Sequence, residues 1–363
     1  MKRVLLTGAA GKVGKHVVRE LTRRGFEVVA SDLGLDGIPG GVRFHRCDLT
    51  DADAVHRMVS FVRPDVVVHA AAVVAPIAYA DPELADAVNL GAARHLIDAT
   101  ERHVPSAFFV FVSSCAAFGP ASPTDPIRCA TDVCRPRDNY GAQKLTVETW
   151  LRESKLRQCS LRLGAVLGTE DLIPKHASYR PFVFMVSLDQ PEHGVDVRDV
   201  ARAVGSAAAK EPDGYTLLIG GDSSWRVAAR QLRRDVFGAV GLPTPSERAF
   251  RRPTNPNASD GWFYECWMDT DESEKVLGFQ RVTREAYMTE LKQRHRTQKW
   301  ALLPLRAVIG GAMLATSPYV GPNRIVSGPT IWDDICRVYD MPSATANAHG
   351  SAATTEVAPR SAS

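Results

Sequence analysis

The segment "TGAAGKVG", residues 7–14, carries three glycines at the junction between two segments of different pattern. The run before it, "RVLLTG" (3–8), has the continuous apolar character of a buried strand, and "VGKHVVRELTRRG" (13–25) predicts a helix that ends at a glycine. Glycines at such a junction permit a tight turn and leave room for a pyrophosphate beside the amides and the positive end of the helix. A glycine triplet alone is weak evidence, so its meaning depends on the segments that follow.

An acidic residue, Asp32, ends the next predicted strand, "EVVASD" (27–32). A carboxylate at this position can accept hydrogen bonds from both hydroxyls of an adenosine ribose, and it repels a 2′-phosphate. The cation of Lys12 in the glycine segment could instead attract a phosphate. On balance the pattern favours NAD over NADP as the cofactor.

A second acid, Asp48, ends the third predicted strand, 42–48. There its side chain and the backbone of Leu49 could contact an adenine base. The alternative is a cap on the helix predicted from residue 51, a role that suits aspartate and threonine. Both roles can coexist if Thr50 is the cap.

Three small residues, Ala70, Ala71 and Ala72, follow the fourth predicted strand, 64–72. Their size would let the backbone approach the middle of a cofactor. Tight packing between the sheet and a helix explains the same residues almost equally well.

Short apolar runs alternate with longer amphipathic segments over the first two thirds of the chain. Continuous β-branched and aromatic runs between helices are typical of a parallel sheet that is covered on both faces, so the sequence predicts an α/β fold. The predicted strands are 3–8, 27–32, 42–48, 64–72, 107–114, 158–168 and 215–221; the predicted helices are 13–25, 51–62, 83–103, 140–155, 196–209 and 224–241, with a helix start within 269–279.

The composition excludes some classes of function. The chain has 363 residues, enough for two domains or one large two-lobed domain. Its 44 basic and 41 acidic residues nearly cancel, which argues against a large nucleic-acid interface. The seven cysteines include no C-x-x-C pair, so they predict free thiols in a reducing compartment and no metal site. Glycines interrupt the N-terminal apolar run, which favours a strand over a signal peptide and hence a cytoplasmic protein.

Three polar side chains have a spacing that suits acid–base chemistry. Ser114 ends the predicted strand 107–114, at the edge where open parallel sheets bind ligands. Tyr140 and Lys144 begin the next helix and, one turn apart, lie on the same face of it. The alternatives are a strand-end hydroxyl that bonds the backbone and an ordinary surface pair on a helix.

The energetics of that site are reasonable. A free tyrosine has a pKa near 10, and lowering it by about 3 units requires roughly 4 kcal/mol. One ammonium about 5 Å away supplies on the order of 3 kcal/mol, and an oxidised nicotinamide adds a second positive charge. Tyr140 could then take the proton of a substrate hydroxyl, with Ser114 bound to the same oxygen and Lys144 bound to the nicotinamide ribose.

The chain resembles a known family, the extended short-chain dehydrogenases/reductases of the NAD-dependent epimerase/dehydratase group. The motifs that carry the resemblance run in family order from residue 7 to residue 279: "TGAAGKVG", "DL" (32–33), "CDLT", "HAAA" (69–72), "VNLGAARHLIDAT" (88–100), "SSCAAFG", "YGAQKLTVE" (140–148), "LRLGAVLG", "VDVRDVARAV" and "DTDESEKVLGF".

The resemblance implies a fold and a set of roles. The fold is a Rossmann doubly wound parallel sheet with a smaller C-terminal substrate-binding lobe, and the family commonly forms homodimers through helices near 90–103 and 140–155. Ser114 is the implied active hydroxyl, four positions before Phe118-Gly119, whereas Ser113 does not fit the family spacing. The implied catalytic residues are Ser114, Tyr140 and Lys144, and the implied cofactor contacts are Gly8, Ala10, Gly11, Lys12, Val13, Gly14, Asp32, Asp48, Leu49, Ala70, Ala71, Ala72, Tyr140 and Lys144.

Departures from the family pattern narrow the chemistry. Dehydratases of the family follow the active hydroxyl with an Asp-Glu pair, and here the residues are Cys115 and Ala116, so dehydration is disfavoured. The connection 168–195 is short where nucleotide-sugar enzymes have a long insert, and it contains the apolar segment "SYRPFVFMVSL" (178–188). A small or hydrophobic substrate is therefore at least as good an expectation as a nucleotide sugar.

Few cations are in place to bind a diphosphate. Lys175 and Arg180 are the cations that stand out in the connection, and Arg198 and Arg251 have the pattern of surface charges.

The C-terminal part contains one apolar stretch outside the core pattern, residues 300–315. A membrane-spanning helix needs about 20 apolar residues, and Pro304 and Arg306 interrupt this one. We expect a helix that packs on the domain or lines the substrate pocket, with an interfacial membrane helix as the alternative. The tail 343–363 is expected to be disordered.

Together these observations predict an NAD-dependent oxidoreductase that interconverts a secondary alcohol and a ketone. The alternatives are a nucleotide-sugar epimerase with tightly bound NAD and a non-catalytic NAD-binding regulatory protein. The predicted division is an NAD-binding domain of residues 1–168 with shared elements in 196–221, and a substrate lobe of residues 169–342.

Overall fold

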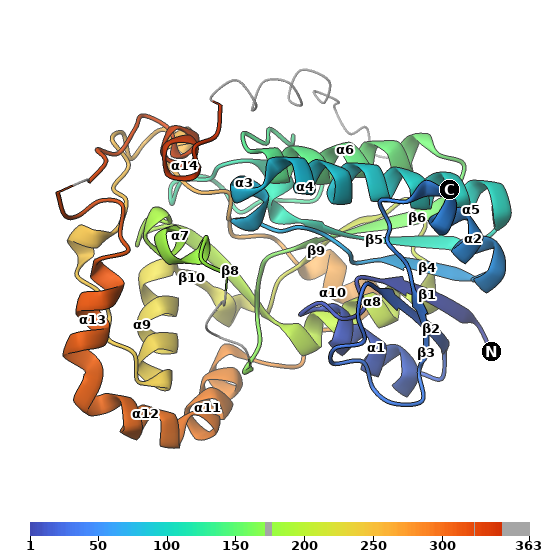
Figure 1. Cartoon of the computed structure of the whole chain (residues 1–363), viewed down its shortest axis with the longest axis horizontal. Helices are drawn as coiled ribbons and strands as arrows, with labels where there is room; N and C mark the ends of the chain where they lie inside the picture. The colour runs from blue at the N-terminus through green and yellow to red at the C-terminus, as the bar shows by residue number, and fades with distance from the viewer. Residues whose placement is uncertain (171–175, 323, 343–363) are drawn as a thin grey trace.

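A seven-stranded sheet forms the centre of the molecule (Figure 1). The structure, a computed structural model, describes residues 1–170, 176–322 and 324–342. The strand order is β3-β2-β1-β4-β5-β6-β9, and every neighbouring pair is parallel. The predicted Rossmann fold is therefore confirmed. The strands are β1 (Arg3–Thr7), β2 (Glu27–Asp32), β3 (Arg43–Arg46), β4 (Val66–His69), β5 (Phe108–Ser114), β6 (Arg157–Leu163) and β9 (Thr216–Ile219).

Helices cover both faces of this sheet, because its strands are apolar on both sides. In β1, Val4 and Leu6 pack into one core while Leu5 packs into the other. The first core lies under α1 (Gly14–Arg23), α8 (Val197–Lys210) and α10 (Asp271–Leu277); the second lies under α2 (Ala52–Val62), α5 (Ala93–His103) and α6 (Asn139–Glu153). From β1 the chain adds β2 and β3 on one side of the sheet, and then β4, β5, β6 and β9 on the other side. Sheets of this kind bind ligands beside the carboxyl ends of the two strands at which the order changes, here β1 and β4.

A smaller lobe lies beside the carboxyl edge of the large sheet (Figure 1). Its three-stranded sheet has the order β10-β8-β7. The elements of the lobe are β7 (Ala165–Leu167), α7 (Tyr179–Met185), β8 (Pro191–Asp196), β10 (Arg226–Ala228), α9 (Ala229–Val240), α11 (Arg284–Arg294), α12 (Arg296–Leu302), α13 (Arg306–Leu314) and α14 (Ile331–Tyr339).

Three predicted elements differ from the structure. The strand predicted at 158–168 is divided at Gly164, where a Cβ would come 2.3 Å from the carbonyl oxygen of His193, and its two parts belong to different sheets. The helix predicted at 224–241 begins only at Ala229, because the residues before it pair as β10 with β8. The prediction of one helix over 83–103 was also too simple: α4 (Pro82–Asp86) and α5 are joined by the π-helical turn η1 (Ala87–Ala92).

The apolar stretch 300–315 packs on the smaller lobe by only one side. It forms the end of α12, the short turn η6 (Leu303–Leu305) and α13, and none of these three elements has a buried residue. Its contacts with the lobe come from Met313 and Leu314, which pack on Phe184 and Phe250. Among the described residues, none of the helices has the length and apolar character that a bilayer crossing requires. The predicted tail 343–363 lies outside the described residues.

Candidate active site

The glycine loop is folded tightly against the end of β4. Gly8 has a φ of +72°, and a Cβ on it would lie 2.5 Å from the amide nitrogen of Ala71. A Cβ on Gly14 would lie 2.0 Å from the carbonyl oxygen of Gly8. Helix α1 has no side-chain cap and no acid in its first turn, so the positive end of the helix suits an anion. The loop therefore fits the pyrophosphate of a dinucleotide, with no room for larger residues at these two glycines.

Asp32 lies beside this loop, at the end of β2. Its Oδ2 accepts a hydrogen bond of 2.9 Å from the amide of Ala10, and its Oδ1 accepts one of 2.7 Å from the amide of Leu33. The carboxylate is thus oriented by the backbone at the position predicted for the adenosine ribose. Lys12 donates to the carbonyl of Val166 in β7 at 2.9 Å, which ties the glycine loop to the smaller lobe. Val13 is the residue that precedes α1.

Asp48 forms a local turn and does not cap α2. Its Oδ1 accepts bonds from the amide and the hydroxyl of Thr50, which lower the pKa of the carboxyl. The capping role expected of Thr50 belongs instead to Asp51, whose side chain accepts from the amide of Ala54 at 3.0 Å. The carbonyl of Leu49 already has a partner, Nδ1 of His95 at 3.1 Å.

The alanines after β4 are held in place by Asn89, a residue that the sequence analysis did not assign. Its amide accepts from the backbone nitrogen of Val73 and donates to the carbonyl of the same residue, both at 2.8 Å. It also donates to Gln143 of α6 at 2.7 Å. Asn89 lies in η1, and π-helical turns are often found at functional sites. The motif "VNLGAARHLIDAT" contained this residue, but its partners are distant in sequence.

The structure brings Ser114, Tyr140 and Lys144 together. The Ser114 side chain accepts from the amide of Ala116 at 3.2 Å. Its hydroxyl lies close enough to the phenol of Tyr140 to lower the pKa of that phenol. The Lys144 ammonium lies 5.8 Å from the centre of the Tyr140 ring and 4.9 Å from that of Phe111. Ser113 does not join this group, because its hydroxyl bonds Glu148 at 2.6 Å.

Burial dominates the protonation of the site. Burial lowers the pKa of Lys144 to about 8, although the charge of Glu148 raises it. Burial also raises the pKa of Tyr140 well above its usual value, against the hydrogen bond from Ser114. In the cofactor-free protein the phenol is therefore neutral at pH 7 and the lysine is mostly charged. The Lys144 ammonium donates to the carbonyl of Val112 at 2.9 Å, which leaves it two further protons to donate.

A buried ion pair between Glu148 and Arg162 lies one helical turn after Lys144, and sequence analysis did not identify it. Glu148 accepts two bonds from the guanidinium of Arg162, at 2.6 and 3.0 Å, and both side chains are almost completely buried. Burial raises the pKa of Glu148, but the charge and hydrogen bonds of Arg162 lower it more. The only signal in the sequence was the position of Glu148, one turn after Lys144 on the same helix face.

Asp138 and Tyr79, which the sequence analysis did not assign, stabilise the first turn of α6. Asp138 caps the helix by accepting from the amide of Gly141, and it accepts a bond of 2.7 Å from the hydroxyl of Tyr79. Burial raises the pKa of Asp138 to about 7. A Cβ on Gly141 would lie 2.4 Å from the carbonyl oxygen of Ala116. The helix that carries Tyr140 is thus in direct contact with the turn that follows Ser114.

The smaller lobe presents mainly aromatic side chains to this site. Tyr140 packs against a cluster that includes Ala116, Phe182 of α7 and Phe263. The rings of Phe182 and Phe263 are 5.3 Å apart. Cys115, which occupies an acid position of the dehydratases, is buried.

Among the described residues, the cations named in the sequence analysis, Arg180, Arg198 and Arg251, do not form a cluster. Arg251 was expected at the surface, but it is 1% exposed and pairs with Asp334 at 2.8 Å. Arg198 pairs with Asp196 and with Glu290. Arg180 is exposed to solvent, and Lys175 lies outside the described residues.

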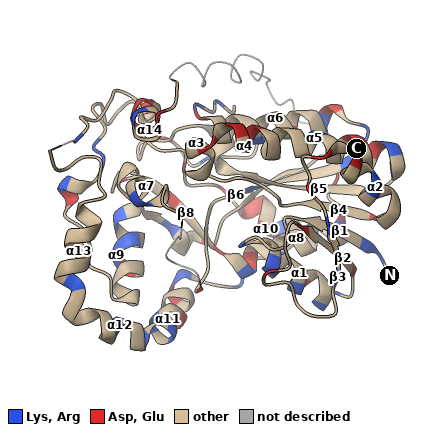
Figure 2. Ribbon diagram, in the orientation of Figure 1, with Lys and Arg blue, Asp and Glu red and all other residues tan. Residues whose placement is uncertain are grey.

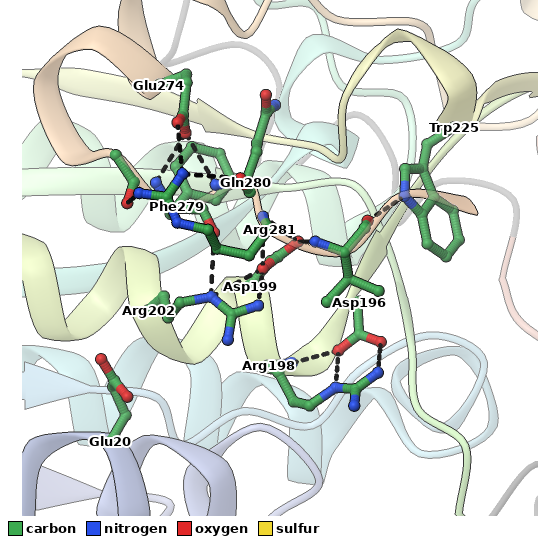
Figure 3. Close-up of polar contacts among 12 residues, drawn as sticks. Glu20, Asp196, Arg198, Asp199, Arg202, Trp225, Glu274, Phe279, Gln280 and Arg281 are labelled. Atoms are coloured by element: carbon green, nitrogen blue, oxygen red, sulfur yellow. Dashed lines mark hydrogen bonds and ion pairs between the residues drawn. The ribbon is translucent and has the colours of Figure 1, made fainter. Parts of the chain in front are cut away.

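Polar contacts fix the smaller lobe to α8 (Figure 3). Asp199 accepts from the amides of Arg281 and Val282 and from the side chain of Arg202. Glu274 accepts from the amides of Phe279 and Gln280. These carboxylates satisfy the backbone of a segment that has no regular structure, so the lobe keeps its place beside the large sheet.

A family model for the NAD dependent epimerase/dehydratase family matches residues 4–220. The same fold is present in the crystal structure of the UDP-glucose 4-epimerase of Thermus thermophilus in complex with NAD, at 25% sequence identity and a TM-score of 0.66. That comparison covers 81% of this chain and 99% of the other.

Two curated relatives are similar to a little under half of this chain. Methionine adenosyltransferase 2 subunit beta of Rattus norvegicus is 30% identical over 177 residues, which is 48% of this chain and 50% of that protein. The 2′-dehydrokanamycin reductase of Streptomyces kanamyceticus is 34% identical over 170 residues, 45% of this chain and 43% of the reductase. The chain thus spans about half the length of the curated relatives it matches.

Proposed function

The chain belongs to the NAD-dependent epimerase/dehydratase family, and from this we propose that it is an NAD-dependent oxidoreductase that interconverts a secondary alcohol and a ketone. The observation that carries the proposal is the contact of Ser114 with Tyr140 beside the buried ammonium of Lys144. Ser114 ends β5 and the other two residues lie in α6, while the glycine loop follows the end of β1 in the same parallel sheet. NAD, when bound, supplies the donor or acceptor of a hydride for the carbon that bears the substrate oxygen.

Each side chain has a separate task. Tyr140 Oη takes the proton from the substrate hydroxyl in oxidation and returns it to the ketone oxygen in reduction. Ser114 donates a hydrogen bond to the same oxygen and keeps it within reach of the phenol. Lys144 stabilises the phenolate by its charge, and its free donors suit the hydroxyls of the nicotinamide ribose. The acid of Asp32 suits the adenosine ribose, and the backbone of the glycine loop suits the pyrophosphate.

We propose a small or hydrophobic substrate. The supporting observations are the aromatic side chains of Phe182 and Phe263 next to Tyr140, and the pairing of Arg198 and Arg251 with acids. The reductase similarity favours net reduction of a ketone, and the UDP-glucose 4-epimerase similarity favours epimerisation with NAD retained.

A panel of substrates separates these two reactions. UDP-glucose and a set of apolar secondary alcohols are incubated with the protein and NAD, and NADH fluorescence and the products are followed. Accumulation of NADH with an alcohol supports the oxidoreductase. An epimerised sugar without net NADH supports the epimerase instead.

The substitution Tyr140→Phe tests the assigned chemistry. It removes the proton-transfer group but keeps the ring, so we expect turnover to fall by about 10³-fold or more while NAD affinity changes little. Tyr215→Phe is the matched control, since Tyr215 is 41% exposed in the loop before β9. Full activity in Tyr140→Phe would refute the mechanism.

A non-catalytic regulatory function is the second candidate. It is favoured by the similarity to a protein named as the beta subunit of a methionine adenosyltransferase. In that case NAD would bind, no member of the panel would be turned over, and Tyr140→Phe would have no measurable effect on the activity of any partner enzyme.

We also propose three properties of the whole protein. The division into an NAD-binding domain and a substrate lobe is supported by the two separate sheets, which separate at Gly164 and not at the predicted residue 168. The seven free cysteines suit a reducing, cytoplasmic location.

A homodimer through α5 and α6 is proposed from the family. Light scattering of the purified protein measures its mass in solution and tests this proposal.

A further inference from the structure

The helices α12 and α13 expose more large apolar side chains than any other part of the described structure. Trp300 is 67% exposed, Leu303 43%, Leu305 50% and Val308 72%. These four lie within the nine residues 300–308, whereas no nine-residue stretch of the described chain outside this segment exposes more than two. We call the exposed side of residues 296–314 the α12–α13 surface.

This surface is not an unfinished part of the core. The opposite side of the same segment already packs on the lobe: the backbone of Lys299 lies against Gly241, and Gly310 lies against Pro243. Met313 and Leu314 pack on Phe184 and Phe250. The segment is thus held in place while its apolar side chains remain in solvent. Contiguous exposed apolar side chains of this kind mark interaction sites.

The charged side chains within residues 291–332 have one sign, and of these Arg294 pairs with Glu170 of another segment. Between residues 291 and 332 the sequence has no aspartate or glutamate. The same segment has six basic residues, although the whole chain carries only +3, so the remainder of the chain has a net charge of −3. These basic residues are Lys292, Arg294, Arg296, Lys299, Arg306 and Arg324. Figure 2 shows further basic residues on the neighbouring α9; these are arginines, and Arg230 and Arg233 pair with acids.

The position of the segment leaves it accessible. In Figure 1, α12 and α13 form the edge of the smaller lobe that is farthest from the large sheet. A flat surface could approach this edge without contact with the crevice beside Ser114 and Tyr140. Helix α13 has nine residues, about 14 Å, so it is too short to cross a bilayer core of about 30 Å.

We infer that the α12–α13 surface docks on an anionic lipid bilayer. Trp300, Leu303, Leu305 and Val308 enter the boundary between headgroups and acyl chains, while Arg296, Lys299 and Arg306 contact acidic headgroups. Exposed apolar side chains with tryptophan in a basic helical segment are typical of helices that lie in the membrane interface. The occupant is a bilayer and not a second copy of this chain, because two copies of so basic a surface would repel each other. The inference does not depend on the reaction that the protein catalyses.

The first test uses the full-length wild-type chain and vesicles. Sedimentation is compared for vesicles of phosphatidylcholine and for vesicles that also contain phosphatidylglycerol, at low and at high salt. We expect binding to the anionic vesicles, at least tenfold weaker binding to pure phosphatidylcholine, and weakening by salt. Absence of binding to anionic vesicles at low salt would overturn the inference.

Two sets of substitutions locate the contact. One variant combines Trp300→Ala, Leu305→Ser and Val308→Ser, and the other combines Lys299→Glu with Arg306→Glu. All these side chains are exposed, so the variants should fold, and thermal unfolding checks this. Each variant should bind anionic vesicles at least tenfold more weakly.

Matched controls lie elsewhere on the surface. Phe61→Ala removes an apolar side chain that is 69% exposed on α2, and Lys155→Glu with Lys275→Glu reverses two exposed charges. Both controls should bind within twofold of the wild type. Equal binding by the surface variants and the controls would overturn the inference. So would a dimer in solution that the apolar variant converts to a monomer, because this surface would then bind a second copy.

Discussion

At the scale of single residues, Lys144 is a buried cation whose charge depends on a carboxylate one helical turn away. Glu148 raises the pKa of Lys144 and is itself kept ionised by Arg162. The pair also bonds Ser113, the neighbour of Ser114. The charge that stabilises a Tyr140 phenolate is therefore supported from within the protein, in a place where solvent does not screen it.

Glu148→Gln tests this support. The substitution leaves the Arg162 guanidinium buried without a counter-charge, so we expect a loss of about 3–5 kcal/mol in the free energy of unfolding, measured in urea. It also removes the charge that raises the pKa of Lys144. Lys144 should then lose its proton at lower pH, and the pH dependence of turnover should shift to lower pH. Glu153→Gln, at the exposed end of the same helix, should change stability by less than about 0.5 kcal/mol. An unchanged free energy of unfolding in Glu148→Gln would show that the ion pair does not stabilise the fold.

Sequence reasoning could propose Ser114, Tyr140 and Lys144 as the candidate catalytic residues. Ser114 ends a recognisable strand, and the other two residues lie one turn apart on the next helix. It missed Glu148, Asp138 and Asn89. The partners of these residues come from other segments, as Arg162 does for Glu148, Tyr79 for Asp138 and Val73 for Asn89. A single polar residue on a helix has many possible partners, and the sequence does not indicate which one the fold provides.

At the scale of elements, the contact between α6 and the turn after β5 sets the distance from Tyr140 to Ser114. This contact depends on Gly141, because the carbonyl of Ala116 occupies the space where a side chain would be. The N-terminal cap by Asp138 orients the same turn of the helix.

Gly141→Ala is expected to separate the catalytic side chains. The added methyl group would have to displace α6 from Ala116, so we expect turnover to fall by about 10²-fold or more with a smaller change in NAD affinity. Gly238→Ala is the control: it lies in α9 with nothing within 4 Å of the added Cβ, and alanine should stabilise that helix by up to about 1 kcal/mol. Turnover and NAD titration are measured for both variants. Wild-type turnover in Gly141→Ala would contradict the assigned contact.

The large sheet could be predicted from sequence because its strands are continuous apolar runs between amphipathic helices. The smaller sheet could not. Strand β8 has the sequence "PEHGVD", which is polar and contains proline and glycine, yet every residue in it is buried. Glu192 lies 3.4 Å from Arg233, His193 bonds the carbonyl of Gly221, and Asp196 pairs with Arg198. The strand exists because tertiary partners satisfy its polar groups, and no local pattern records those partners.

At the scale of the whole molecule, two neutral histidines are buried in the fold. Burial lowers the pKa of His69 to about 3 and that of His193 to about 4. His193 donates from Nε2 to Gly221 and accepts at Nδ1 from the amide of Met268, so a proton on Nδ1 would face another donor. The unfolded chain binds protons at these histidines near pH 6.5, whereas the folded chain does not.

Acid should therefore destabilise the protein. The contribution of His193 to stability is present above pH 6.5 and is lost as the pH falls toward 4, by about 3 kcal/mol. Urea unfolding at pH 8 and at pH 4.5 measures the loss. His193→Gln should lose clearly less stability between these two pH values than the wild type. The same loss in both proteins would show that His193 does not contribute.

The central claim is that Tyr140 is an acid–base group controlled by Lys144 and by the charge of the cofactor, and the ionisation of its phenol tests this most directly. Tyrosinate absorption is measured against pH for the wild type and for Tyr140→Phe, each free, with saturating NAD⁺ and with saturating NADH. In the free protein burial holds the pKa of Tyr140 well above its usual value near 10; the positive ring of NAD⁺ should lower it to near 8, and neutral NADH should not. We predict one additional phenolate near pH 8 in the wild type with NAD⁺, absent with NADH and absent from Tyr140→Phe. Identical titrations of the two proteins with NAD⁺ up to pH 10 would contradict the claim.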